Sequence, residues 1–171
     1  MNEELKNFSR EELIEYIEVL SKNWLAIDGT WFQAVEKEFG MEKAIKCDKE
    51  SWNIFSVVEA KRLMQVFNIP ENGGIPALIK ALKLRVYANI NIQEIVEVSD
   101  DRCVFRMNDC RVQSARNRKG LPDFPCKEVG LIEYNNFAKI IDPRIEVTCI
   151  CCPPDVHPND YYCAWEFRLV K

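Results

Sequence analysis

The sequence predicts an α+β fold in which N-terminal helices pack on a four-stranded antiparallel sheet made of two hairpins, with a helical excursion between them. Apolar residues recur at helical spacing through the first half of the chain, whereas four segments of the second half alternate between apolar and polar residues. The 171 residues are expected to form a single domain, with a helical part at 1–88 and a sheet and cysteine-rich part at 89–171.

Capping residues and glycines set the expected ends of the first helices. Ser9 and Glu12 are spaced as a capping box, and Asp28-Gly29 predicts a turn after the helix that this box begins. Gly40 suits the position just beyond the second helix. We therefore expect one helix between the Ser9 cap and the turn at Asp28-Gly29, and further helices over residues 30–39, 51–67 and 76–87.

The second half of the chain changes to the period of a β-strand. Residues 90–98 and 103–107 alternate on either side of a turn at Asp100-Asp101, which predicts the first hairpin. The second hairpin is expected to comprise residues 145–151 and 161–169. Between the two hairpins, helices are expected over residues 109–119 and 125–140.

Composition and charge exclude several classes of function. Hydrophobic residues make up 47% and charged residues 29% of the chain, which is ordinary for a globular protein. The net charge is −4 and neither half is basic, so a nucleic-acid partner is not expected. The polar start and the lack of a run of about 20 apolar residues predict neither a signal peptide nor a membrane span. We expect a cytoplasmic protein whose eight cysteines stay reduced.

Two of these cysteines fall in the first turns of expected helices. Cys110 follows Asn108-Asp109, and Cys126 comes three residues after Asp123. Unpaired N–H groups at a helix N-terminus favour a thiolate, and the basic residues Arg111 and Lys127 act in the same direction. Both positions are therefore candidates for reactive or metal-ligating thiols, although a small residue in a first turn is also common.

A C-x-x-C motif, Cys149 to Cys152, ends the third expected strand and leads into a Pro-Pro turn. Strand alternation places Cys149 and Cys151 on one face and Cys152 on the other, unless the turn returns Cys152 to the first face. The metal-site prediction combines this pair with the two helix-start cysteines, because four sulfurs suit zinc or an iron–sulfur cluster. The predicted ligands are Cys110, Cys126, Cys149 and Cys152.

Other readings of these cysteines stay open. They are also candidates for redox or nucleophilic thiols, or for small apolar residues of the core. For nucleophilic chemistry the candidate catalytic set is Cys126 or Cys110 with Glu36 or His157 as the base. Glu36 lies one helical turn beyond Phe32, and His157 is the only histidine, in the loop after the C-x-x-C. The alternatives are a solvated helix residue and an exposed loop residue.

Five short motifs carry a resemblance to known proteins. They are DGTWF at 28–32, FPCK at 124–127, IDPRI at 141–145, CICCPPD at 149–155 and CAWEF at 163–167. With these motifs the chain resembles a family of uncharacterised prokaryotic cytosolic proteins, and more distantly the 2-amino-thiazoline-4-carboxylate hydrolase family. Its element order is similar to that of the 4-vinyl reductase domain fold group. This resemblance implies helices covering a four-stranded sheet, with a pocket between the layers.

Together these observations predict a protein that binds a small molecule or a metal at a cysteine-based site. The alternative is a hydrolase of a small amidine-like or thiazoline-like C–N substrate that uses a cysteine nucleophile. A small-molecule ligand is the expected partner, with no nucleic acid and no membrane. The aromatic content permits a homo-oligomer.

Overall fold

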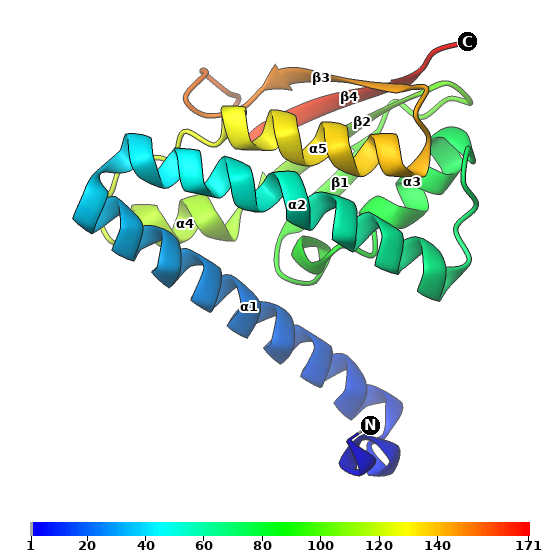
Figure 1. The fold of residues 1–171 in the computed structure, drawn as a ribbon, viewed down its shortest axis with the longest axis horizontal. Helices are drawn as coiled ribbons and strands as arrows, with labels where there is room; N and C mark the ends of the chain where they lie inside the picture. Colours follow the sequence, from blue (N-terminus) through cyan, green and yellow to red (C-terminus); the bar gives the residue numbers. More distant parts are fainter. Residues whose placement is uncertain (1) are drawn as a thin grey trace.

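The computed structural model describes residues 2–171, which form helices on one face of a four-stranded antiparallel sheet, as expected (Figure 1). The elements are η1 (Glu3–Asn7), α1 (Arg10–Phe39), α2 (Met41–Phe67), α3 (Gly74–Leu82), η2 (Val86–Asn89), β1 (Ile92–Val96), β2 (Arg102–Asp109), α4 (Arg111–Asn117), α5 (Lys127–Ile141), β3 (Ile145–Cys151) and β4 (Cys163–Leu169). None of the helices described is long and apolar enough to cross a membrane.

The sheet is formed from two hairpins placed side by side in the order β1-β2-β4-β3. Strand β2 pairs with β4 so that Phe105 lies opposite Trp165 and Cys103 opposite Phe167. These four side chains are buried and form the inner face of the sheet. The predicted α+β class and the two hairpins are confirmed.

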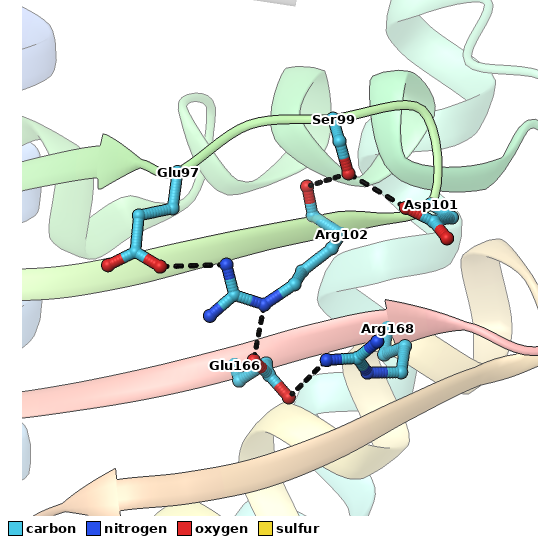
Figure 2. Close-up of polar contacts among 6 residues, drawn as sticks. All are labelled: Glu97, Ser99, Asp101, Arg102, Glu166 and Arg168. Carbon is cyan, nitrogen blue, oxygen red and sulfur yellow. Dashed lines mark hydrogen bonds and ion pairs between the residues drawn. The ribbon is translucent and has the colours of Figure 1, made fainter.

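The outer face of the sheet is polar, and no helix among residues 2–171 covers it (Figures 1 and 2). Arg102 donates a hydrogen bond to Glu97 at 2.7 Å and another to Glu166 on the neighbouring strand. Glu166 also accepts one from Arg168 at 3.4 Å, as Figure 2 shows. Because these charges lie on the outer face, the apolar core and any enclosed site must lie on the inner one.

The helices are stacked in successive layers on the inner face. Helix α5 lies directly on the sheet, α2 packs on α5, and α1 packs on α2 (Figure 1). The closest approach is at Gly130 of α5, where an added Cβ would come within 2.6 Å of the Trp165 ring. Helix α5 therefore needs a residue without a side chain at this point. The helix that lies next to the sheet, α5, belongs to the helical excursion between the two hairpins.

Three expected boundaries in the helical half are wrong. Helix α1 continues through Asp28-Gly29, because a glycine costs an α-helix only about 1 kcal/mol and the Thr30 hydroxyl can bond within the helix, to the Ala26 carbonyl at 2.8 Å. The chain turns instead at Gly40, which has a φ of 82°, so α2 begins ten residues earlier than expected. The helix expected over 76–87 is divided into α3 and η2. The capping box of Ser9 and Glu12 is confirmed.

A β-bulge changes the faces of two cysteines in β3. Cys149 pairs with Trp165 and Cys151 with Ala164, so the two cysteines lie on opposite faces of the sheet. The prediction that they share a face is therefore wrong. The extra residue, Ile150, cannot be recognised from alternation alone.

Arg85 crosses the core as the centre of a buried ion-pair network. Its Nε lies 2.8 Å from Glu59 and its Nη1 2.7 Å from Glu133, and all three side chains are buried. The guanidinium also lies over the rings of Phe137 and Tyr134. Burial alone would lower the pKa of Arg85, but the two carboxylates raise it above its usual value. This network links α2, η2 and α5.

Candidate functional site

A cavity of about 870 Å³ lies between the helices and the inner face of the sheet. Its volume is within the range of pockets that bind small molecules. One wall consists of α1 residues between Lys22 and Gln33. The opposite wall is formed by residues of α4, α5, β2 and β4. Aromatic side chains line much of it, namely Phe32, Trp52, Tyr87, Phe124, Tyr134 and Trp165.

Contacts between aromatic rings hold much of the cavity lining in place. Trp52 and Tyr87 are stacked with their ring centroids 5.7 Å apart, and Trp24 contacts both edge-on. Phe32 of α1 and Phe124 also pack edge to face, with their ring centroids 4.8 Å apart. These contacts join α1 to α2, to η2 and to the loop before α5, so the cavity has a defined apolar surface.

Four thiols line the cavity, those of Cys110, Cys126, Cys152 and Cys163. The sulfur atoms of Cys126 and Cys152 are 3.4 Å apart. The Pro-Pro turn therefore brings Cys152 back toward the inner face. The backbone N–H of Lys127 donates to the Pro153 carbonyl at 3.0 Å, which ties together the two segments that carry these cysteines.

Gln113 fixes the segment just before Cys126. Its buried side chain donates to the Phe124 carbonyl and accepts from the Phe124 N–H, both at 2.9 Å. The same amide nitrogen lies 3.5 Å from the Cys126 sulfur. As a result Cys126 occupies the N-cap position of α5 with its thiol partly accessible.

The surroundings of three of the four predicted metal ligands, Cys110, Cys149 and Cys152, favour the thiol over the thiolate. Burial raises the pKa of Cys110 to about 12 and outweighs the N–H groups of Gln113 and Val112, which lower it. Burial thus works against the thiolate that the helix N-terminus favours at Cys110, and a reactive or ligating role for this residue stays a prediction. Burial also raises the pKa of Cys149, to about 11. Hydrogen bonding to Cys126 and Cys163, together with burial, raises the pKa of Cys152.

The structure brings two of the four predicted metal ligands into contact, Cys126 and Cys152. Cys110 lines the same cavity, whereas Cys149 lies outside it. Within residues 2–171, no group of three or more His, Cys, Asp or Glu side chains could hold a metal ion as arranged. Zinc or a cluster held by Cys110, Cys126, Cys149 and Cys152 stays a prediction, and it would require these side chains to move together.

The two predicted bases lie outside the cavity. Glu36 accepts two hydrogen bonds from buried Arg116, at 2.8 and 3.1 Å, and so anchors α4 to α1. His157 is half-buried, its Nδ1 lies 2.8 Å from the Pro158 carbonyl oxygen, and its ring packs against Tyr162. Neither residue contacts Cys110 or Cys126 among the interactions of residues 2–171.

Four carboxylates line the cavity that were not assigned to a site from the sequence: Asp28, Asp48, Asp109 and Glu133. Burial, with the charges of Asp28 and Glu133 added, raises the pKa of Asp48 to about 7. Burial also raises the pKa values of Asp28 and Glu133. One sequence pattern could have identified Asp48, which lies one helical turn before Trp52 and therefore on the same face of α2. The expected helix began at residue 51, so this shared face was not recognised.

Comparisons with known proteins add a family but no activity. No curated protein and no solved structure matches the chain. A family model, described as a family of unknown function, matches residues 6–169. The match covers both the helical half and the cysteine-rich half, so the chain belongs to the DUF6125 family.

Proposed function

We propose that this protein binds a small organic molecule in the cavity between its helices and its sheet. The observation that carries the proposal is the cavity itself, about 870 Å³ in volume and lined by aromatic rings, carboxylates and thiols. Protein interiors are otherwise close-packed, and a cavity of this size lowers the stability of the fold because its lining atoms lose packing contacts. A bound molecule would restore those contacts.

The walls of the cavity favour a ligand with an aromatic or aliphatic body and a polar group. Trp52 and Tyr87, which are stacked on each other, line the cavity and supply apolar surface for such a body. Asp28 and Asp48 supply acceptors, and no ion pair satisfies either of them among residues 2–171. The thiol of Cys126, which is half-buried and lines the cavity, is a nucleophile available to a bound molecule.

A cysteine-dependent hydrolase of a small C–N substrate is the second candidate function. The specific support is the position of Cys126, partly accessible at the N-terminus of α5 and lining the cavity. Asp48 lines the cavity, whereas Glu36, a base expected from the sequence, does not. With its pKa raised to about 7, Asp48 is suited to accept a proton near neutral pH.

Two substitutions of Gly29 test the proposed binding site. Gly29 lies in the middle of α1, lines the cavity, and has no heavy atom within 4 Å of an added Cβ. We expect Gly29→Ala to raise the free energy of unfolding by about 0.5–1 kcal/mol, because alanine is the better helix former. Gly29→Phe should place a ring in the cavity and abolish binding of the fluorescent probe anilinonaphthalene sulfonate.

Urea unfolding followed by circular dichroism gives the stability of both variants, and probe fluorescence gives the binding. Gly29→Ala is the matched control, since it should keep the binding of the wild-type protein. If folded Gly29→Phe protein bound the probe as tightly as Gly29→Ala, the cavity would not be the binding site.

A further inference from the structure

We propose that Cys126 and Cys152 form a dithiol site that exchanges with a low-molecular-weight disulfide entering the cavity. This inference rests on the proposed function, because the disulfide must enter the same cavity. The two sulfur atoms are 3.4 Å apart, whereas a disulfide bond is about 2.05 Å long. Closing this gap needs a movement of little more than 1 Å, within the reach of side-chain rotation.

The backbone around the two cysteines is already arranged for this bond. Besides the hydrogen bond from Lys127 to Pro153, the Lys127 side chain forms an ion pair with Asp155 at 2.7 Å. These contacts lie directly after the two cysteines in the chain. The segments that carry the sulfurs are therefore held together in the reduced protein, which favours a disulfide between them over one with a more distant cysteine.

The surroundings of the two thiols assign them different roles. Cys126 is partly accessible and lines the cavity, so it is the thiol that a small disulfide meets first. Cys152 is buried beneath it, next to Cys163. The Cys126 thiolate attacks one sulfur of the small disulfide and releases one thiolate, leaving a mixed disulfide. Cys152 then attacks the Cys126 sulfur while its proton passes to the departing sulfur, which leaves as the second thiol. One small disulfide is reduced to two thiols, and the protein dithiol is oxidised.

Peptide mass spectrometry tests this assignment. Reduced protein carrying Cys47→Ser, which removes an exposed thiol, is treated with hydroxyethyl disulfide, and the remaining thiols are alkylated under denaturing conditions. We expect a Cys126–Cys152 disulfide with no stable adduct. Adding Cys152→Ser should trap the mixed disulfide at Cys126, and adding Cys126→Ser should abolish reaction at Cys152.

Each outcome separates this inference from the proposed function. A disulfide between other cysteines, or a stable Cys126 adduct while Cys152 is present, would overturn the dithiol assignment. If the cavity binds the fluorescent probe but no exchange occurs, the dithiol inference alone fails. If Gly29→Phe protein reacts as fast as Gly29→Ala protein, the disulfide does not enter through the cavity and the inference fails, while probe binding to the same two variants decides the proposed function separately.

A separate observation concerns helix α1. Figure 1 shows α1 and α2 meeting near residue 40 and separating toward the N-terminus, so the first half of α1 lies away from the sheet. Apolar residues recur along α1 at the alternating spacing of three and four that two packed helices use. They are Leu13, Ile17, Leu20, Trp24, Ile27 and Trp31.

We infer that α1 packs on α1 of a second copy of this chain. The side chains of Ile14, Ile17, Leu20, Ile27 and Trp31 are between 48% and 70% exposed. At about 200 Å² for a fully exposed large side chain, they present roughly 550 Å² per copy, most of the ~800 Å² that one partner contributes to a standard interface.

A groove beside α1 indicates where the second copy lies, and the charges along the helix indicate its direction. The groove runs between α1, α2 and η2, and Leu20 and Trp24 line it as well as belonging to the apolar row. Residues 11–18 hold four glutamates, which would repel one another in a parallel pair and are kept apart in an antiparallel one. The interface is therefore expected to be antiparallel and two-fold symmetric.

Sedimentation velocity tests the second inference. We expect the wild-type protein to sediment with the mass of two chains at micromolar concentration, and Leu20→Glu or Ile27→Glu to sediment as one chain with unchanged helicity. Val156→Glu, a change in an exposed loop far from α1 in the sequence, is the control and should remain a dimer. A monomeric wild-type protein, or a dimer that neither α1 variant dissociates, would overturn the inference.

Discussion

Replacing Arg85 by Ala is expected to lower the free energy of unfolding by about 3–5 kcal/mol. The change removes the guanidinium that contacts Glu59 and Glu133, at 2.8 and 2.7 Å, and leaves both carboxylates buried without it. Exposing or protonating the two carboxylates costs free energy, and the alanine side chain makes no contact that offsets this cost. Urea unfolding at neutral pH, with Arg62→Ala on the exposed part of α2 as the control, measures the loss.

The pH dependence of this variant gives a second readout. A buried carboxylate has a raised pKa in the folded state, so its destabilising effect is absent below the unfolded pKa and grows as the pH rises toward the folded pKa. The deficit of Arg85→Ala should therefore be smaller at pH 5 than at pH 8. Adding Glu133→Gln should recover part of the stability at pH 8. A loss below about 1 kcal/mol at pH 8 would contradict the role of the network.

Gly130→Val should destabilise the protein by about 2–3 kcal/mol. The Cβ alone would lie 2.6 Å from one Trp165 ring atom and 3.0 Å from another. Trp165 is fully buried, so its ring can yield only by giving up its packing against the core and turning toward the cavity that it lines. Either α5 must shift from the sheet or the indole must leave its rotamer, and urea unfolding reports the cost.

Gly29→Val is the matched control for this prediction, because both glycines lie within helices and both variants introduce the same β-branched residue. The added atoms at Gly29 enter open space, so the difference between the two variants isolates the contact with Trp165. Equal stabilities for Gly29→Val and Gly130→Val would show that α5 does not pack on the sheet as closely as described.

Local patterns predicted much of the fold because each rests on a short-range physical cause. The Ser9 capping box, the two hairpins and the helical excursion between them all depend on residues a few positions apart, and all are present. The turn expected at Asp28-Gly29 is absent because tertiary contacts of α1 outweigh the modest helix cost of one glycine. The bulge at Ile150 is equally invisible to a period-two pattern.

The candidate site was predictable only in part. Cysteines at helix starts and beside a turn indicated where thiols could gather, and Cys126 does meet Cys152. The pairing of Glu36 with Arg116, 80 residues away, follows from how α4 docks on α1 and has no local signal. Asp48 was likewise missed, because its place in the cavity depends on α2 beginning at Met41.

Native mass spectrometry of the purified protein tests the central claim most directly. If the cavity binds a small organic molecule, wild-type and Gly29→Ala protein should each carry a co-purifying molecule that is released on unfolding, and folded Gly29→Phe protein should carry none. The same molecule retained by Gly29→Phe at the wild-type level would contradict the account, because the ligand would then be bound elsewhere.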